Sequence, residues 1–357
     1  MRILHLINSL SSGGAERQLS YLAPELVRRG HDIHVAYSNK GPDKPELPGV
    51  VLHWLKSLSN HNPYLLWQLI RLIRHIKPDI IQTWVPQMDI LGGMAAKLCR
   101  TPLIFREPSS GLVHTQMWKN YLRVRIGSGA SAIVSNSRGG DEYWETILPD
   151  NRRYVVSNAL PVDEIDGTMA ALPQEMTTPE APIVLYVGRM EGKQKRPKLF
   201  LEALACVRQK KNVFGVLCGE GPQRFELEML KHELGLDADI HFTGFLPATS
   251  VWAMMKKASV FVSLSHSEGC PNAPMEAMAC GCPLVISDIP AHREILDESC
   301  ALFVDPSNVQ QTASAIIQII DNAEVSKKRA LLAKRKTLVW SIAEMARNYE
   351  RVYKECL

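Results

Sequence analysis

Short apolar runs alternate with amphipathic stretches along almost the whole chain. Residues 2–8 read as a strand that is buried on both faces, because apolar side chains follow one another with little alternation. Residues 15–29 show helical periodicity, and residues 31–37 form the next apolar run. A strand, a helix and a strand within about 35 residues predict one right-handed βαβ unit of a parallel sheet.

The same alternation continues on both sides of one interruption. Before it, the pattern predicts helices over 65–76, 92–99 and 118–126, and strands over 79–83, 102–105 and 132–135. Residues 159–182, rich in proline, threonine and acidic side chains, read as a linker. After it, the pattern predicts strands over 183–187, 214–218, 241–243, 260–264 and 284–286, and helices over 197–209, 224–234, 250–257, 274–280 and 309–322.

Two doubly wound α/β lobes in series explain this pattern, and 357 residues suit two domains better than one. We expect an N-terminal lobe over residues 1–160 and a C-terminal lobe over residues 161–339. The amphipathic tail, residues 340–357, is expected to cross back to the first lobe. Open α/β sheets bind ligands at the carboxyl ends of their strands, so we expect a central cleft between the two lobes.

Composition narrows the class of protein. The 46% hydrophobic and 22% charged content is that of a globular protein. The eight irregularly spaced cysteines favour reduced thiols over a disulfide framework. The apolar runs are too short to span a bilayer and no signal peptide is visible, so we expect a cytoplasmic protein.

The segment from Ser265 to Gly281 is the most informative for chemistry. It follows an apolar run and leads into a helix, for which Asn272 is the expected N-cap. The N–H groups at the start of such a helix suit a diphosphate. Glu268 in the loop can accept hydrogen bonds from sugar hydroxyls, and Glu276 in the first helical turn can bind ribose hydroxyls. The alternative is a helix that is merely stabilised by acidic residues near its start, which explains Glu276 but not the loop that carries Glu268.

A basic loop follows the strand that opens the second lobe. Arg189 comes directly after Val187 and Gly188, and Lys195 lies six residues further along. Arginine binds phosphate oxygens in a bidentate fork and lysine acts as a point charge, so the two side chains can converge on a diphosphate leaving group. A solvated basic surface loop is the alternative.

A third loop follows the first strand. Gly13 and Gly14 allow close backbone approach to a ligand, and Glu16 lies in the helix that starts there. The loop carries neither the dinucleotide fingerprint nor a Walker A motif, and a tight βα turn explains it equally well.

Together these motifs resemble glycosyltransferase family 4. The resemblance rests on Gly13-Gly14-Ala-Glu16, Gly188-Arg189 with Lys195, and Glu268-x7-Glu276, with further similarity at 219–222 and at Phe242-Thr-Gly244. It implies the GT-B fold, a nucleoside-diphosphate sugar donor and retention of anomeric configuration.

The resemblance also assigns roles to residues. It implies that Arg189 and Lys195 hold the diphosphate, Glu276 the ribose, Glu268 the donor sugar, and the backbone of Phe242 and Gly244 the base. The residues of the loop and helix start are expected to bind substrate as well: Gly269, Pro271, Asn272 and Ala273.

The chain departs from the family pattern at two places. Arg196 follows Lys195 where a glycine is usual, which changes the expected loop shape. Many relatives have a histidine facing the donor sugar after the strand at 102–105, where this chain has Arg106 and Glu107. Arg106 is therefore a candidate substrate-binding residue, and a structural ion pair is the alternative.

Neither a metal site nor a membrane-binding site has a specific pattern in the sequence. The histidines lack ligand spacing and Asp237-Ala-Asp239 lies on a helix-to-strand connection, so we expect neither a metal nor another cofactor. Trp67 with its neighbouring arginines, and Trp118 with its basic neighbours, fit either a membrane-surface contact or the outer faces of sheet-covering helices.

The sequence therefore predicts a metal-independent retaining hexosyltransferase. The expected donor is a UDP-sugar in preference to a GDP-sugar, the acceptor is a saccharide or a lipid-linked saccharide of surface polysaccharide or glycolipid assembly, and no nucleic acid is involved. The alternatives are a UDP-sugar epimerase of the same two-lobed fold and a non-catalytic sugar-binding protein. A nicotinamide oxidoreductase would need the glycine fingerprint that the chain lacks.

Overall fold

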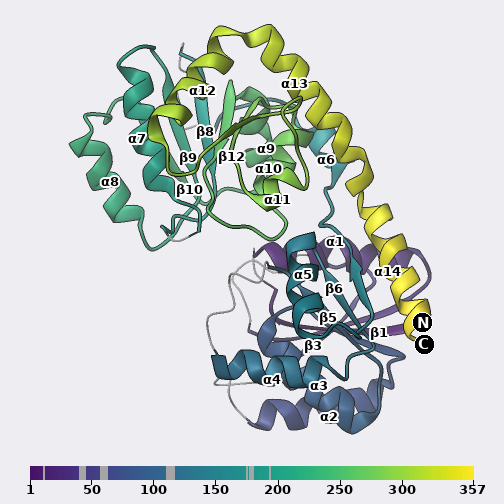
Figure 1. Cartoon of the computed structure of the whole chain (residues 1–357). Helices are drawn as coiled ribbons and strands as arrows, with labels where there is room; N and C mark the ends of the chain where they lie inside the picture. The colour runs from purple at the N-terminus through teal and green to yellow at the C-terminus, as the bar shows by residue number, and fades with distance from the viewer. Residues whose placement is uncertain are drawn as a thin grey trace. The chain divides into compact units, whose positions relative to one another are not determined.

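A computed structural model describes residues 1–10, 13–39, 46–56, 63–109, 117–173, 176, 181–192 and 194–357. The chain divides into two compact units (Figure 1). Unit 1 comprises Met1–Ala159 and Trp340–Leu357, and unit 2 comprises Leu160–Val339. Residues 11–12 of the first glycine loop, residues 174–175 and 177–180 of the expected linker, and Lys193 of the basic loop lie outside the described residues.

Unit 1 is built on a parallel sheet whose strand order, over the described residues, is β3-β2-β1-β4-β5-β6-β7. The strands are β1 (Arg2–Ser9), β2 (Asp32–Asn39), β3 (Val51–Trp54), β4 (Ile80–Thr83), β5 (Leu103–Glu107), β6 (Ala132–Ser135) and β7 (Arg153–Val155). The order reverses between β1 and β4, which makes the carboxyl ends of these two strands the switch point of the sheet.

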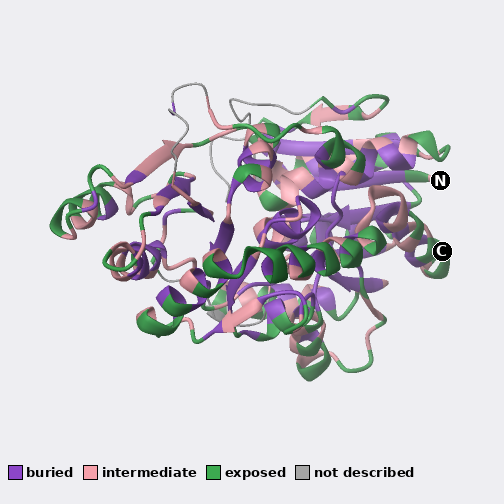
Figure 2. Ribbon diagram, turned by 90° about the horizontal axis from the view of Figure 1, so that it is seen from above, coloured by how far each residue is buried: buried purple, intermediate pink, exposed green. Residues whose placement is uncertain are grey.

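Helices cover both faces of this sheet. They are α1 (Gly14–Arg28), α2 (Pro63–Ile76), α3 (Pro86–Cys99), α4 (Met117–Gly127), α5 (Arg138–Ile147) and the C-terminal α14 (Ile342–Cys356). Side chains on one face, such as Ile3 and Ile7, pack with α1 and α14, and alternate residues such as Leu4 and Leu6 pack with α2 and α3. The central strands β1, β4, β5 and β6 are largely buried, while outer helix faces are exposed (Figure 2).

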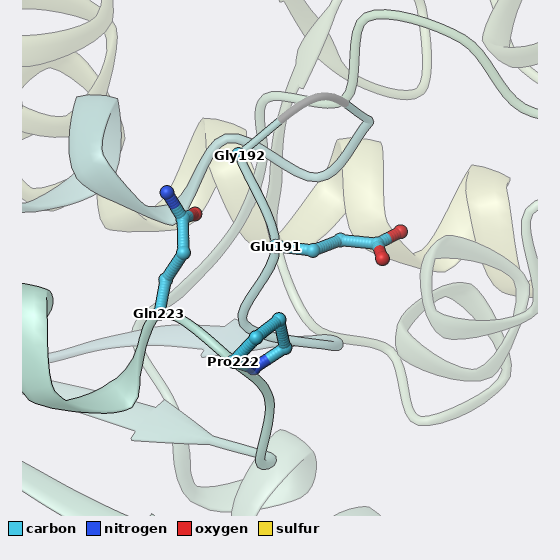
Figure 3. A pocket seen from close by; sticks show the side chains of 4 residues that line it. All are labelled: Glu191, Gly192, Pro222 and Gln223. Carbon is cyan, nitrogen blue, oxygen red and sulfur yellow. The ribbon is translucent and has the colours of Figure 1, made fainter.

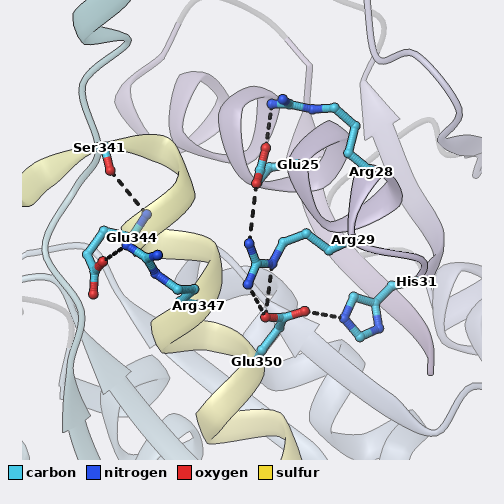
Figure 4. Close-up of polar contacts among 8 residues, drawn as sticks. All are labelled: Glu25, Arg28, Arg29, His31, Ser341, Glu344, Arg347 and Glu350. Carbon is cyan, nitrogen blue, oxygen red and sulfur yellow. Dashed lines mark hydrogen bonds and ion pairs between the residues drawn. The ribbon is translucent and has the colours of Figure 1, made fainter.

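The C-terminal helix α14 packs against α1 and completes the core of unit 1. The Ser341 hydroxyl caps its first turn by accepting from the Glu344 N–H at 3.2 Å. Further along, Glu350 accepts hydrogen bonds from Arg29 at 2.7 Å and lies 2.8 Å from His31 Nε2 (Figure 4). The middle of α14 is therefore bound to the region where α1 leads into β2.

Unit 2 repeats the architecture, with the strand order β10-β9-β8-β11-β12-β13 over the described residues. The strands are β8 (Ile183–Val187), β9 (Phe214–Cys218), β10 (Ile240–Gly244), β11 (Val260–Ser263), β12 (Leu284–Ser287) and β13 (Leu302–Val304). The switch point lies between β8 and β11.

The helical layer of unit 2 surrounds a core that includes Val184, Val262 and Phe200. The helices are α6 (Val162–Gly167), α7 (Pro197–Arg208), α8 (Arg224–Glu233), α9 (Ala248–Lys257), α10 (Asn272–Ala279), α11 (Pro290–Arg293), α12 (Val309–Asp321), α13 (Ala323–Lys336) and the 3-10 turn η2 (Thr337–Trp340).

The structure corrects the expected elements in several places. Asn272 is the first residue of α10 and not its N-cap: Pro271 occupies that position, without a side-chain cap. The segment read as a linker contains α6, and α3 begins six residues earlier than expected, at Pro86. The elements without a strong local signal are the short strands β3, β7 and β13 and the helices α5, α11 and α13. Short edge strands and a helix with an evenly charged sequence leave little hydrophobic periodicity to detect.

Candidate active site

Four glycines shape the carboxyl ends of β8, β9 and β10 in unit 2. Gly219 has φ +135°, and a Cβ added there would lie 2.1 Å from the Gly188 carbonyl oxygen. A Cβ on Gly221 would lie 2.5 Å from the Met190 carbonyl oxygen, and Gly244 has φ +70°. The loops after these three strands therefore approach one another backbone to backbone, which only glycine permits.

The basic loop after β8 meets the loop after β11 across the switch point. The Lys195 Nζ lies 2.5 Å from the Glu268 carboxylate, and both side chains are largely buried. The Gln194 carbonyl accepts from the His266 N–H at 2.8 Å, and the Gln194 side-chain amide donates to the Ser267 carbonyl at 2.9 Å. The structure thus brings together two predicted site residues that lie 73 positions apart in sequence.

Arg189 lies on the same loop in a different setting. Its side chain is 68% exposed, and its Nε is 3.6 Å from the Glu191 carboxylate. The Tyr186 hydroxyl lies between the backbones of Arg189 and Lys195, 3.4 Å from the Arg189 carbonyl and 3.5 Å from the Lys195 carbonyl. Burial, reinforced by the charges of Glu268 and Glu191, raises the pKa of Tyr186, so this hydroxyl stays protonated.

Arg196 explains how the loop keeps its shape without the family's glycine. Its backbone is left-handed, with φ 49° and ψ 50°, and it forms the N-cap of α7. A non-glycine residue in this conformation is strained. The departure noted in the sequence therefore changes the local energy of the loop, while Lys195 still reaches Glu268.

The start of α10 presents backbone N–H groups beside this pair. Gly269, Pro271, Asn272 and Ala273 form the turn that leads into the helix. Glu276 is buried in the helix at 4% exposure. Burial and then the Glu276 charge raise the pKa of Cys280 to about 12. The same carboxylate contributes, after burial, to the raised pKa of Cys218 at the end of β9. The Glu276 carboxylate is therefore close enough to the end of β9 to act on it electrostatically.

The expected base-binding turn lies at the end of β10. The Arg224 guanidinium sits over the Phe242 ring at 4.6 Å. The backbone of β10 shifts register between Phe242 and Gly244, where the Gly244 carbonyl accepts from the Gly219 N–H at 2.9 Å. The turn is thus tied to the glycine-lined loops after β8 and β9.

A hollow opens between the loops after β8 and β9. Its lining residues are Glu191, Gly192, Pro222 and Gln223 (Figure 3). The similarity at 219–222 noted in the sequence thus belongs to the wall of a surface pocket at the carboxyl edge of the sheet.

The first-lobe glycine loop has a different arrangement. Gly13 is the N-cap of α1, and Gly14 is the first helical residue. The Glu16 carboxylate folds back and accepts from the Ser9 hydroxyl at 2.8 Å. It also covers Gly13, where an added Cβ would lie 2.2 Å from Glu16 Oε2. Glu16 therefore closes the start of its own helix.

Arg106 and Glu107 point to opposite faces of β5. Arg106 is 2% exposed, donates to the Asn158 side-chain oxygen at 2.5 Å and lies over the Trp84 ring at 4.6 Å. Glu107 pairs with the buried Arg123 at 2.7 Å. The ion pair at this position is thus made by Glu107, whereas Arg106, for which an ion pair was the alternative, is buried inside unit 1 against Asn158 and Trp84.

One buried residue near the site carried no signal in the sequence. His292 is fully buried, and its Nδ1 lies 2.8 Å from the Ser287 carbonyl. The Ser287 hydroxyl in turn donates to the Ser265 carbonyl at 2.6 Å. The ring thereby anchors the end of β12 to the loop that carries Glu268, a contact that a lone histidine in the sequence does not reveal.

Two family models match the chain. The model described as "Glycosyltransferase Family 4" matches residues 12–164, and the model described as "Glycosyl transferases group 1" matches residues 171–337. The chain belongs to glycosyltransferase family 4.

Relatives of this family-4 chain act in glycolipid assembly. It is 26% identical to the Campylobacter jejuni N-acetylgalactosamine-N,N'-diacetylbacillosaminyl-diphospho-undecaprenol 4-alpha-N-acetylgalactosaminyltransferase, with 96% of each chain covered. It is 25% identical to the Rhizobium meliloti lipopolysaccharide core biosynthesis glycosyltransferase LpsD, over 92% of this chain and 90% of the relative. The chain is thus a glycosyltransferase.

Solved structures show that this family-4 chain has the GT-B fold. Its structure matches Anabaena HepE, determined in complex with UDP and glucose, with a TM-score of 0.86 and 17% identity over 99% of both chains. It also matches a sucrose-phosphate synthase from Thermosynechococcus elongatus with a TM-score of 0.81, at 17% identity over 99% of this chain and 98% of that one.

Within the residues that the structure describes, no group of three or more histidine, cysteine and acidic side chains is arranged to hold a metal ion. Asp237 instead lies 2.7 Å from His232, and Asp239 pairs with Arg208 at 2.8 Å. Within the same described residues, every helix is too short or too polar to cross a bilayer.

Proposed function

We propose that this chain is a retaining hexosyltransferase that uses a nucleoside-diphosphate sugar, with a UDP-sugar favoured. The acceptor is a hydroxyl of a saccharide or a lipid-linked saccharide, and the product belongs to surface polysaccharide or glycolipid assembly. The observation that carries the proposal is the pairing of Lys195 with Glu268 at 2.5 Å, beside the start of α10 and at the switch point of a parallel sheet. The UDP and UDP-glucose complexes of Anabaena HepE support the choice of base.

The proposed donor site assigns one task to each charged group. A departing diphosphate gains negative charge, and preorganised cations and helix N–H groups stabilise such charge most where water is excluded. Lys195 leaves Glu268 for a phosphate oxygen, and the exposed Arg189 turns onto the diphosphate in a bidentate fork. Glu268, released from the ion pair, accepts from hydroxyls of the donor sugar. Glu276 binds the ribose.

In the proposed reaction, the acceptor hydroxyl attacks the anomeric carbon from the face that the diphosphate leaves. The bond to the phosphate oxygen breaks as the new glycosidic bond forms, and that phosphate oxygen takes the acceptor proton. Configuration is retained without a covalent enzyme intermediate. Protein cations neutralise the leaving group in this scheme, so neither a metal nor another cofactor takes part.

Two substitutions test the proposal. Arg189→Ala and Glu276→Ala should each lower turnover with a UDP-sugar by roughly 10²–10³-fold while the protein stays folded. Glu324→Ala, which removes an exposed glutamate of α13, is the matched control and should leave turnover unchanged. If purified Glu276→Ala turned over a UDP-sugar at the parental rate, the assignment of this site would be wrong.

Donor and reaction class can be read from two further measurements. Thermal-shift screening against UDP-, GDP- and ADP-sugars should show the largest stabilisation with UDP-sugars, because a ligand that binds only the folded state raises apparent stability. A sugar-nucleotide epimerase would convert the donor without an acceptor, so product analysis in the absence of acceptor separates the two enzymes.

The proposal includes contact of α2 and α4 with the cytoplasmic surface of an anionic membrane. Trp67 on α2 is 50% exposed with the Arg71 guanidinium 5.5 Å from its ring. Trp118 on α4 is 62% exposed with Lys119 Nζ 5.5 Å from its ring. Exposed aromatics beside cations suit the headgroup region of a bilayer.

Vesicle binding tests the membrane contact. The protein should cosediment with phosphatidylglycerol vesicles and less with phosphatidylcholine vesicles, and combined Trp67→Ser and Trp118→Ser substitutions should reduce this binding. Equal binding of vesicles by the parent and the double variant would contradict a membrane contact through Trp67 and Trp118.

A further inference from the structure

Two buried arginines of unit 1 differ in how their charge is balanced. Arg123 lies 2.6 Å from Asp89 and 2.7 Å from Glu107, with its side chain 2% exposed. Arg106 is equally buried, but its described contacts are the Asn158 side-chain oxygen, the Trp84 ring and the neighbouring Tyr349, none of them a carboxylate. Its Nη1 is buried and has no hydrogen-bond partner among the described residues. A buried charge is costly unless an opposite charge or a set of hydrogen bonds compensates it.

Three more buried polar atoms beside Arg106 also lack a partner in the described part of the chain. They are His5 Nε2, Gln82 Nε2 and the Tyr349 hydroxyl oxygen, and each residue is at most 1% exposed. Buried polar atoms are nearly always hydrogen-bonded in folded proteins. Four buried polar atoms without a hydrogen bond in one region therefore indicate a missing partner.

These side chains lie together on one face of the sheet. His5 on β1 is the register partner of Gln82 on β4, so the two side chains are neighbours on the same face. The Trp84 ring nitrogen reaches His5, and the Arg106 guanidinium covers the Trp84 ring. The Tyr349 hydroxyl on α14 lies close enough to the Arg106 guanidinium and the Gln82 amide to interact with both, but these contacts do not reach the distance and angle of a hydrogen bond. The group thus sits between three strands and the C-terminal helix.

The unpartnered atoms are hydrogen-bond donors. Burial lowers the pKa of His5 to about 3, so the ring is neutral. Its Nδ1 accepts from the Trp84 Nε1–H at 3.1 Å, which leaves the ring proton on Nε2. The Gln82 side-chain oxygen accepts from the Tyr353 hydroxyl, so the Gln82 amide N–H groups remain to donate. Arg106 can only donate, and the Tyr349 hydroxyl can donate as well.

A set of donors with one unbalanced positive charge calls for an acceptor that carries negative charge. We propose that His5, Gln82, Arg106 and Tyr349 form a buried binding site for a small monovalent anion of chloride size. The anion balances the Arg106 charge and joins α14 to the strands β1, β4 and β5. This site is independent of the donor chemistry in unit 2 and concerns the stability of unit 1.

Anion-dependent stability tests the site. The melting temperature of the full chain, measured in sodium chloride against sodium gluconate at equal ionic strength, should rise by roughly 3–6 °C at chloride about ten times its Kd, and the rise should saturate. Arg106→Gln should abolish the rise, and Tyr349→Phe should weaken it. Arg29→Gln is the matched control: it breaks the ion pair of α14 with α1, lowers the melting temperature and keeps the chloride-dependent rise.

Crystals soaked in sodium bromide give a second readout that does not depend on a variant's ability to fold. We expect an anomalous peak within hydrogen-bond distance of His5 Nε2, Gln82 Nε2 and Arg106 Nη1. Equal melting temperatures in chloride and gluconate, a chloride-dependent rise that persists in Arg106→Gln, or a water in place of the bromide would each overturn the proposal.

Discussion

The carboxyl ends of the two sheets have equivalent topology but are lined by different kinds of residue. In unit 2, Gly188 and Gly219 let neighbouring loops touch through their backbones, and the charged Arg189 remains 68% exposed on top of them. In unit 1, large side chains fill the corresponding region, and Arg123 is buried between Asp89 and Glu107. The same residue type thus contributes to packing where it is enclosed, and where it is exposed it is available for the proposed contact with the diphosphate.

This difference separates substitutions that should change stability from substitutions that should change turnover. Breaking the buried network of unit 1 should lower the free energy of unfolding, while changing exposed cations of unit 2 should lower turnover with little effect on folding. The following changes test this contrast in decreasing order of effect.

Arg123→Met should have the largest effect on stability. Removing the guanidinium leaves the carboxylates of Asp89 and Glu107 buried without their cation, which should lower the free energy of unfolding by about 3–5 kcal/mol. Urea unfolding followed by circular dichroism measures the loss. Arg125→Met removes an exposed arginine of the same helix and should change stability by less than about 0.5 kcal/mol. Equal losses in the two variants would show that the buried network does not stabilise unit 1.

Gly219→Ala should have the next largest effect. The new Cβ would meet the Gly188 carbonyl oxygen at 2.1 Å in a backbone with φ +135°, so we expect a loss of about 2–4 kcal/mol in unit 2. Gly235→Ala is the matched control, because Gly235 also has positive φ but no atom lies within 4 Å of the new Cβ. Its cost should be about 1 kcal/mol. If both variants cost the same, backbone strain alone, and not contact between the loops, would explain the glycines.

Glu350→Gln should destabilise unit 1 by about 1 kcal/mol at neutral pH. The hydrogen bond from Arg29 lowers the pKa of Glu350 in the folded protein. A carboxyl group with a lowered folded pKa contributes its stability above the unfolded pKa of about 4.3 and loses it as the pH falls through the folded value. The difference in melting temperature between the parent and Glu350→Gln should therefore be full at pH 7 and shrink below about pH 4.

Glu344→Gln is the control for this measurement. Glu344 pairs with Arg347 on its own helix at the surface, so its substitution should change the melting temperature little at either pH (Figure 4). A pH-independent difference for Glu350→Gln would contradict the assigned ion pair.

Arg196→Gly should produce the smallest change and the opposite sign. Glycine relieves the left-handed strain at φ 49°, offset in part by its greater freedom in the unfolded chain, so we expect a gain of up to about 1 kcal/mol. Arg196→Ala keeps the strain and loses the side chain, and it should be no more stable than the parent. Melting temperatures of the three proteins decide this, and a destabilised Arg196→Gly would mean that the arginine side chain outweighs the strain.

Much of the fold follows from local patterns. Strands buried on both faces, such as β1 and β8, are continuous apolar runs, and the helices between them are amphipathic, so alternation alone predicts two parallel sheets. Asn272 shows the limit at the level of single residues: a good capping residue became the first residue of α10, because the turn at Pro271 already supplied the end of the loop.

Tertiary packing determines which polar side chains from distant parts of the sequence come together. Spacing pointed to Lys195 and Glu268 separately, but their ion pair exists because β8 and β11 are neighbours in the sheet. Arg106 and Glu107 are adjacent in sequence, yet the pleat of β5 sends one toward α14 and the other toward Arg123. Periodicity along a chain specifies which face of an element is apolar, whereas the partner of a polar group depends on strand order and register, which are properties of the folded sheet.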